Sequence, residues 1–271
     1  MSPFQFDEAE ILTFFAVLIR YSVLFSLLPF LGDRVIPMPL KVLFSVAVTI
    51  VLFPSLVKLG LVVPGEAQAW SANAGGIARV VASEALFAAV LGFTARFVFD
   101  SISFGANLVG TFMGFASATQ FDPHHESQTQ IVAEFYLALA MLVFLALDGH
   151  HLMLRAALDS YRWVGVGQVN LSSGTFSEEL LMISTQVFKY GIQLAAPVGI
   201  AIFTVNVAFG VLSKAMPQLN VLVLSFSVTA LIGLAVMFFS LSDFQGLTAQ
   251  IFERMGEWMG SVSRSISGTG R

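Results

Sequence analysis

Hydrophobic residues in this chain occur in long runs that are separated by short polar stretches. A helix that crosses a membrane needs about 20 mostly apolar residues. Seven segments approach this pattern: residues 11–31, 42–57, 77–99, 101–121, 131–147, 192–213 and 215–242. The last segment is long enough for one helix or for a bent pair, and residues 42–57 are short and contain Pro54. The pattern predicts an all-α integral membrane protein with about seven apolar helical segments.

After Ser242 the hydrophobic pattern changes its period. Apolar residues then recur every three or four positions, at Phe244, Leu247, Ile251, Met255, Trp258, Val262 and Ile266. This spacing predicts one amphipathic helix with an apolar stripe. The stripe could lie on the membrane interface, pack on the chain's own helices, or dock a partner. We favour the first two interpretations, because amphipathicity alone specifies no partner.

The longest polar stretch, residues 148–189, contains the turn residues Gly165 and Gly167. Ser177 is followed by two glutamates, and acidic residues in a first turn complement the helix dipole, so a helix is expected to start there. This stretch is predicted to connect the N-terminal two thirds of the chain to a C-terminal helical hairpin.

Composition narrows the functional classes. Of the 271 residues, 56% are hydrophobic and only 11% are charged, whereas soluble domains carry about a quarter charged residues. The net charge of −4 provides no basic patch for nucleic acid, and the absence of cysteine excludes disulfides and thiolate chemistry. Acidic residues precede the first basic residue, Arg20, so a cleavable secretory signal is not expected and the first helix is predicted to remain in the mature protein.

Histidines are the candidate metal ligands, and they form two adjacent pairs, His124-His125 and His150-His151. Neighbouring side chains on a helix diverge by about 100°, whereas zinc needs three or four converging ligands. We therefore expect loop or helix-end histidines and neither a metal nor another cofactor. No HExxH, GxSxG, Walker or GxGxxG motif is present, so enzyme activity is not expected.

Three ionisable residues lie within apolar segments. Arg20 is central in its segment, and Glu84 and Glu134 are possible counter-ions. A charge at such a depth costs about 2.5–3.5 kcal/mol or more unless it is paired or hydrated. A proton or ion relay of a transporter is one interpretation. An ion pair between helices is the interpretation we favour, because a relay should show several aligned carboxylates.

Small residues recur at four-residue spacing in the fourth apolar segment, at Ala106, Gly110, Gly114 and Ala118. Such a stripe lets two helix backbones approach closely. The segment then runs into Pro123, which disfavours helical geometry at Asp122. A glycine-loosened segment rich in methionine and phenylalanine could also form a movable obstruction in a pore. The spacing alone leaves close contact and obstruction both open.

Four ordered stretches resemble the FliR family of flagellar type III export-gate proteins and its injectisome counterpart. They are Leu18-Ile-Arg20 with Leu28-Pro29 and Arg34-Val-Ile-Pro37; Val109–Gly114 with Phe121-Asp-Pro123; Asp148-Gly149-His150; and Leu194-Ala-Ala-Pro197 with Gly210-Val-Leu-Ser-Lys-Ala-Met-Pro-Gln-Leu-Asn220. The last run is the most specific. The resemblance covers nearly the whole chain.

The resemblance implies an all-helical chain of kinked hairpins, similar to a fusion of the partner proteins FliP and FliQ. It implies a FliP-like region over residues 1–160, a connector and FliQ-like hairpin over 161–242, and an amphipathic tail over 243–271, within one integrated domain. One copy would join several FliP and FliQ copies around an export pore, with its apolar helices largely raised into that assembly. FlhB, FlhA, membrane lipid and exported flagellar proteins are the other expected partners.

The resemblance also implies roles for single residues. A loop between central helices forms a plug in the family's pore, and the matching residues are Met113, Gly114, Phe115, Ala116, Ser117, Thr119, Phe121, Asp122 and Pro123. The shared motif positions are expected to be structural: Arg20, Pro29, Pro37, Gly149, His150, Pro197, Lys214, Pro217, Gln218 and Asn220. Lys214 is often arginine in the family, and lysine keeps the charge without the planar fork.

The function that these observations predict is that of a flagellar export-gate subunit in the bacterial inner membrane, at the flagellar basal body. An injectisome gate subunit and an ion or small-molecule transporter are the alternatives. In the transporter interpretation Arg20, Glu84 and Glu134 would be functional.

Overall fold

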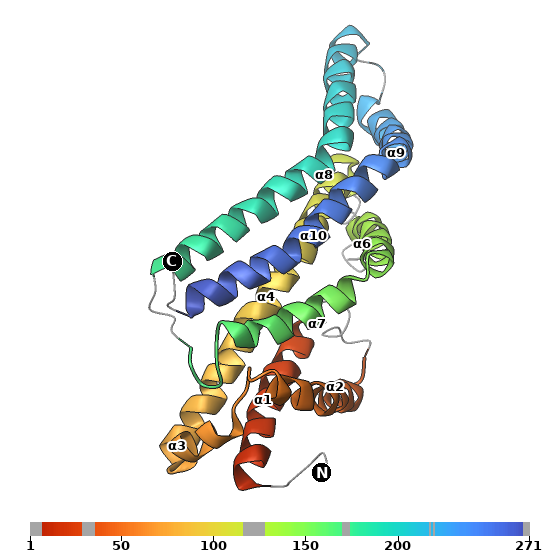
Figure 1. Ribbon diagram of the computed structural model, residues 1–271. Helices are drawn as coiled ribbons and strands as arrows, with labels where there is room; N and C mark the ends of the chain where they lie inside the picture. Colours follow the sequence, from red (N-terminus) through yellow and green to blue (C-terminus); the bar gives the residue numbers. More distant parts are fainter. Residues whose placement is uncertain are drawn as a thin grey trace. The chain divides into compact units, whose positions relative to one another are not determined.

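The structure is a computed structural model that describes residues 7–28, 36–115, 128–169, 174–216, 218 and 220–267. Nine α-helices lie in these described ranges: α1 (Glu8–Leu27), α2 (Met38–Lys58), α3 (Ala67–Ser71), α4 (Ala74–Phe112), α6 (Gln128–Ala146), α7 (Gly149–Asp159), α8 (Gly174–Ala215), α9 (Val221–Phe239) and α10 (Leu241–Ile266). Short 3₁₀ turns are η1 (Pro64–Glu66) and η2 (Ser160–Arg162). Figure 1 labels the helices, and the described residues include no strand.

Four helices, α1, α2, α4 and α8, are long and apolar enough to cross a membrane. The number rises to as many as six if the bent pairs α6 with α7 and α9 with α10 each count as one span. The expectation of an all-α integral membrane protein is thus confirmed. Acidic residues in the first turn of α1 and a proline in the first turn of α2 favour these helix starts.

The predicted segment boundaries needed two corrections. Segments 77–99 and 101–121 are not separate helices: α4 has 39 residues and continues past Asp100. The polar stretch 148–189 is not a single connector either, because it contains α7, η2 and the start of α8. Helix α8 begins at Gly174, and the hydroxyl of Ser177 donates to the Gly174 carbonyl at 2.8 Å.

The chain divides into two compact units that interleave along the sequence. Unit 1 comprises Met1–Phe97, His150–Ile183 and Arg254–Arg271, and unit 2 comprises Val98–Gly149 and Ser184–Glu253. Helices α4, α8 and α10 contribute residues to both units.

Aromatic side chains form part of the core of each unit. In unit 1, Phe14 of α1 packs edge-on against Phe53 of α2, with ring centroids 5.5 Å apart. In unit 2, three phenylalanines from α4, α6 and α10 meet with centroid separations of 5.4, 5.0 and 5.1 Å: Phe99, Phe144 and Phe252.

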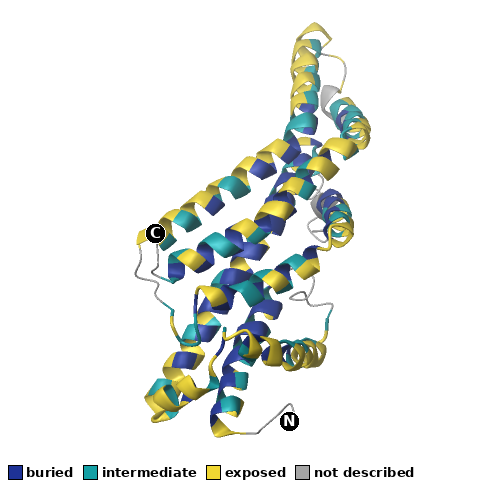
Figure 2. Cartoon of the chain, viewed as in Figure 1, coloured by how far each residue is buried: buried dark blue, intermediate teal, exposed yellow. Residues whose placement is uncertain are grey.

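The apolar stripe of α10 is largely buried within the chain. Ile251, Met255, Val262 and Ile266 are each 0% exposed. The predicted amphipathic helix is therefore confirmed, and its stripe packs on the chain's own helices, which was one of the favoured interpretations. Figure 2 shows this buried face of α10 and, in contrast, long exposed faces on α2, α8 and α9.

Candidate functional site

A buried ion pair joins α1 to α4 in unit 1. The side chains of Arg20 and Glu84 are both 0% exposed. Arg20 Nε donates to Glu84 Oε2 at 2.6 Å, and Arg20 Nη2 donates to Glu84 Oε1 at 2.9 Å. The guanidinium and the carboxylate therefore meet through two parallel hydrogen bonds, the geometry in which such pairs are strongest.

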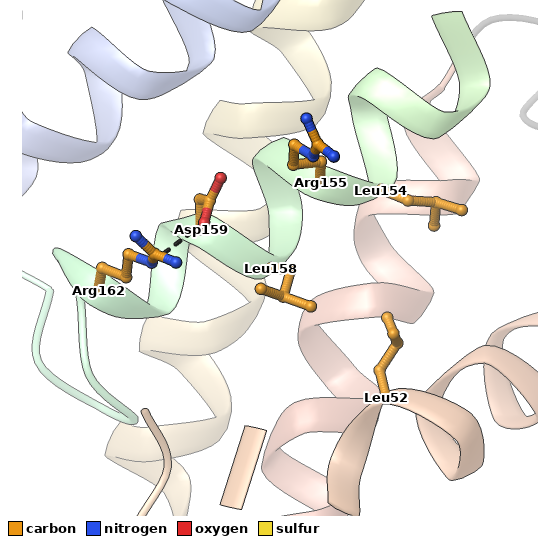
Figure 3. A pocket seen from close by; sticks show the side chains of 6 residues that line it. All are labelled: Leu52, Leu154, Arg155, Leu158, Asp159 and Arg162. Atoms are coloured by element: carbon orange, nitrogen blue, oxygen red, sulfur yellow. Dashed lines mark ion pairs between the residues drawn. The ribbon is translucent and has the colours of Figure 1, made fainter. Parts of the chain in front are cut away.

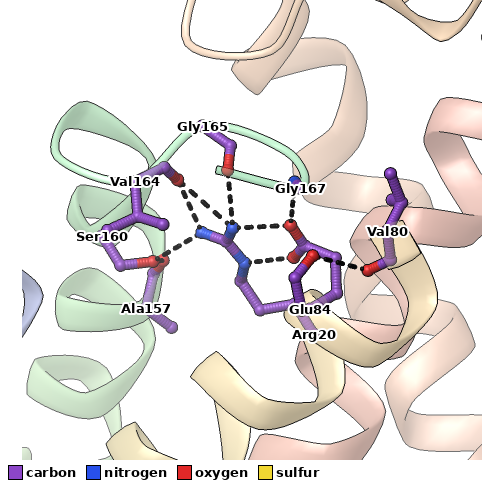
Figure 4. A network of polar contacts seen from close by, with 9 residues as sticks. Arg20, Val80, Glu84, Ala157, Ser160, Val164, Gly165 and Gly167 are labelled. Atoms are coloured by element: carbon purple, nitrogen blue, oxygen red, sulfur yellow. Dashed lines mark hydrogen bonds and ion pairs between the residues drawn. The ribbon is translucent and has the colours of Figure 1, made fainter. Parts of the chain in front are cut away.

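The remaining polar atoms of this ion pair are used by the turn that follows α7 (Figure 4). Arg20 donates to the Ser160 hydroxyl and the Val164 carbonyl at 3.2 Å and to the Gly165 carbonyl at 3.4 Å. The backbone N–H of Gly167 donates to Glu84 Oε1 at 2.8 Å. The pair thus holds three parts of unit 1 together: α1, α4 and the 160–167 turn.

Gly167 is required by this arrangement. Its φ is +74°, which strains any residue with a side chain, and an added Cβ would lie 2.8 Å from a methyl carbon of Val80. Its lack of a side chain lets the backbone N–H approach the Glu84 carboxylate.

Aromatic rings enclose the guanidinium. The Arg20 Cζ atom lies 3.7 Å from the centroid of the Tyr161 ring and 4.6 Å from that of Phe87. Such stacking favours arginine over lysine. The hydroxyls of Tyr21 and Tyr161 are buried without a hydrogen-bond partner among the described residues. Glu134, the other proposed counter-ion, is exposed on α6 in unit 2 and takes no part in the pair.

The described start of the predicted plug, Met113 to Phe115, packs against α9. Met113 is 1% exposed, and its side chain covers Gly233. The Thr229 hydroxyl donates to the Met113 carbonyl at 3.3 Å. Gly114 has φ +88°, and an added Cβ would lie 3.0 Å from the Phe226 ring. The other predicted plug residues, Ala116, Ser117, Thr119, Phe121, Asp122 and Pro123, lie outside the described residues, as does Ala118.

A close approach of α4 and α8 in unit 2 involves glycines that the sequence analysis did not single out. Ala106 and Gly110 are buried on α4 as a packing stripe would require. However, it is at Gly105 that a Cβ would lie only 2.5 Å from the Gly191 carbonyl oxygen of α8. In α8, Gly191, Ala195 and Gly199 themselves form a four-residue small stripe, and this signal could have indicated the contact.

The family-motif residues are distributed over both units. Pro37 precedes α2, and Pro197 lies inside α8. Gly149 is buried at the start of α7 because its Cα faces the Phe144 ring. Lys214, Gln218 and Asn220 are exposed where α8 meets α9, whereas Pro29 and Pro217 lie outside the described residues.

His150 and His151 are exposed, and their ring centroids are 4.1 Å apart. The two rings therefore lie side by side, whereas the sequence analysis expected neighbouring side chains on a helix to diverge. The other histidine pair, His124-His125, lies outside the described residues.

A large apolar surface is uncovered on α8. Its exposed large hydrophobic side chains include Leu181, Phe188, Ile192, Ile200, Phe203, Val207 and Val211. Phe203 is 70% exposed. Such a surface is typical of contact with lipid or with another protein.

Comparison with known proteins identifies the family of this chain. Residues 11–255 match the family described as bacterial export proteins, family 1. The chain is 28% identical to the flagellar biosynthetic protein FliR of Escherichia coli (strain K12) over 224 residues, which are 83% of this chain and 82% of that protein. It is 27% identical to FliR of Pectobacterium carotovorum subsp. carotovorum over 254 residues, 94% of each chain. It is 26% identical to FliR of Bacillus subtilis (strain 168) over 212 residues, 78% of each. Since the family match spans most of its length, the chain belongs to the bacterial export proteins, family 1.

Proposed function

We propose that this chain is a subunit of the flagellar protein export apparatus and forms part of the pore through which unfolded flagellar proteins pass. Its place would be the bacterial inner membrane, at the flagellar basal body. The family match and three relatives named as flagellar biosynthetic proteins support a flagellar role over an injectisome role. The chain carries no phosphate-binding loop, so energy for export would come from partners or from the proton gradient.

The observation that carries this proposal is the length of the uncovered apolar face on α8. The helix has 42 residues, about 63 Å at 1.5 Å per residue. Within unit 2, exposed large apolar side chains of this helix extend from Phe188 to Val211, about 35 Å of helix. A hydrocarbon core is only about 30 Å thick, and helix tilt rarely exceeds about 40°. An untilted helix would leave part of this face outside the hydrocarbon core, so lipid, other protein subunits or both would cover it.

We propose that helices of partner subunits cover part of this apolar face of α8. FliP and FliQ, in a helical assembly with one copy of this chain, would contact α8, and FlhB and FlhA would be further neighbours. Exported flagellar proteins would be the substrates, and lipid would cover the apolar surface that remains.

Native mass spectrometry tests this assembly. The chain would be co-expressed with FliP- and FliQ-like partners and extracted in mild detergent. We expect a large complex that contains one copy of the 29.2 kDa chain. A matched variant, Ile200→Gln/Phe203→Gln/Val207→Gln, changes only exposed positions on α8 and should lose partners while the chain itself stays folded. A monomer or homodimer that ignores both partners contradicts the proposal, and so does a triple variant that assembles normally.

A closing plug that begins at Met113 is the second part of the proposal. The buried Met113 and the positive-φ Gly114 would fix the start of the segment on α9, so that the residues up to Pro123 close the pore from a defined anchor. Methionine and phenylalanine would give the plug an adaptable surface.

Deleting residues 113–121 should leave assembly intact but make the membrane leak ions. Ion flux across vesicles that contain the complex measures the leak, and native mass spectrometry of the same sample controls for assembly. A tight membrane around a normally assembled complex would refute the plug.

A further inference from the structure

An open pocket of about 510 Å³ lies on unit 1 between α2 and the α7–η2 segment (Figure 3). Its lining combines two chemical types. Leu52 of α2 faces Leu158 of α7, and Leu154 extends this apolar wall. Arg155 and Arg162 supply the cationic part, and Asp159 is the one acidic residue of the lining.

The charges of the pocket favour an anion. Two arginines and one aspartate leave one net positive charge among the lining residues. Asp159 Oδ1 forms an ion pair with Arg162 Nε at 3.1 Å, and both side chains are substantially exposed. Arg155 is exposed and has no carboxylate partner among the described residues. Its five N–H donors are therefore available to a ligand, and their planar fork matches phosphate oxygens.

The pocket lies toward one end of α2. Helix α2 has 21 residues, about 31 Å, which matches the thickness of one hydrocarbon core. Leu52 lies six residues before Lys58, the exposed last residue of this helix, so it is about 9 Å from the helix end. Arginine side chains at this level can extend their charged ends toward the headgroup layer.

The surface beside Leu52 suits an acyl chain. Val51 of α2 is 71% exposed and Ile50 is 46% exposed, although both are strongly apolar. A free phosphate or a soluble phosphorylated metabolite would make no use of this apolar wall. A lipid places a phosphate and an acyl chain next to each other, as the arginines and the leucines are placed here.

From this combination we infer that the pocket lined by Arg155, Arg162 and the three leucines is a binding site for an anionic phospholipid. The phosphate contacts the two guanidinium groups, and an acyl chain lies along Leu52 and the exposed face of α2. Asp159 weakens the site because it occupies Arg162 and repels the phosphate. The pocket shares no lining residue with the segment proposed as the plug.

Native mass spectrometry of the detergent-solubilised full chain, together with any partners that co-purify, tests the site. After delipidation, the sample is titrated with dioleoyl phosphatidylglycerol or with dioleoyl phosphatidylcholine, which differ only in the headgroup. We expect phosphatidylglycerol to be retained preferentially. The Arg155→Gln/Arg162→Gln variant should bind it about 30-fold more weakly, the effect expected of two arginines near a membrane surface.

Matched controls separate this site from general charge effects. Arg79→Gln/Arg254→Gln removes two other exposed arginines of unit 1 and should leave retention of phosphatidylglycerol unchanged. Asp159→Asn should tighten binding about fivefold, because it removes a neighbouring negative charge. A poorly folded protein cannot produce this gain. Glycerol phosphate at the same concentration should not displace the lipid.

Four results would overturn the inference. They are equal retention of the two lipids by the unaltered chain, equal losses in the pocket and control variants, no gain with Asp159→Asn, and displacement by glycerol phosphate, which would indicate a plain phosphate site. If a partner subunit covers the pocket, the intact complex will retain the two lipids equally, and this result also contradicts the inference.

Discussion

Replacing Glu84 by glutamine is expected to destabilise unit 1 by about 3–5 kcal/mol, the usual cost of removing one partner from a buried ion pair. The neutral amide cannot compensate the buried Arg20 guanidinium, and it can accept only one of the two short hydrogen bonds at 2.6 and 2.9 Å. A second argument gives a similar magnitude: two unit charges 4 Å apart attract by about 4 kcal/mol at an effective dielectric constant of 20.

The pair is also expected to be strongly coupled. Replacing Arg20 by methionine leaves the Glu84 carboxylate buried with one remaining described donor, the Gly167 N–H. When Arg20→Met is combined with Glu84→Gln, no uncompensated charge remains. The double variant should therefore cost about 2–3 kcal/mol less than the sum of the two single variants.

Tryptophan fluorescence reports this unit selectively. The chain has three tryptophans, Trp70, Trp163 and Trp258, and all of them belong to unit 1. Denaturant unfolding in a fixed mild detergent, followed by this signal, gives the free energy for each variant. Glu134→Gln removes an exposed carboxylate of unit 2 and should change the free energy of unfolding by less than about 0.5 kcal/mol. A loss below about 1 kcal/mol for Glu84→Gln, or additive single and double variants, would refute the reasoning.

Two further predictions concern glycines of unit 2. Gly191→Ala should lower stability by about 1–3 kcal/mol, because the new methyl group would overlap the Phe104 ring. In Gly210→Ala the new methyl group would meet nothing within 4 Å, so this variant should be neutral or stabilising by up to about 1 kcal/mol. Thermal unfolding followed by circular dichroism compares the two variants. Equal unfolding midpoints would contradict the close packing at Gly191. Gly114→Ala should cost about 1–3 kcal/mol, because its φ is +88° and its Cβ would press on Phe226. An unchanged thermal midpoint for this variant would show that the turn does not need glycine.

The hydrophobic pattern predicted the helical class because long apolar runs leave few alternatives, but it misplaced some helix ends. Asp100 separates two apolar windows, yet α4 runs through it. Helix hydrogen bonds are local, and one charged side chain on a 39-residue helix does not interrupt them. The hydropathy of a window measures how apolar a segment is, whereas a helix ends where its backbone changes conformation.

The buried charge site was only partly predictable. The depth of Arg20 indicated that it needs a partner, but two glutamates were available, and spacing along the chain does not show which one faces it. The other ligands of the pair, at Val164, Gly165 and Gly167, are backbone groups. Backbone carbonyls and N–H groups have no sequence signature, so only the presence of glycine at position 167 could have provided an indication.

The small-residue stripe on α4 shows a related limit of sequence reasoning. Four-residue spacing identifies a face of small residues but not which neighbouring residue lies at the point of closest approach. On α4, Gly105 lies close to the backbone of α8, one position before Ala106 of the predicted stripe. The partner stripe on α8, from Gly191 to Gly199, was visible in the sequence, but pairing the two stripes requires the relative rotation of both helices.

Some charged and apolar side chains of this chain are placed differently from those of a typical soluble protein. The Arg20–Glu84 pair is fully buried, while Phe203 is 70% exposed and Phe239 is 80% exposed. In water each of these phenylalanines would cost about 1–2 kcal/mol relative to a covered position, whereas lipid or a partner helix removes that cost. The two charges of the Arg20–Glu84 pair compensate each other inside unit 1, so the ion pair should form without any partner. The apolar faces of α8 and α9 are satisfied only by surroundings outside the chain, and these faces are therefore where lipid and partner subunits should bind.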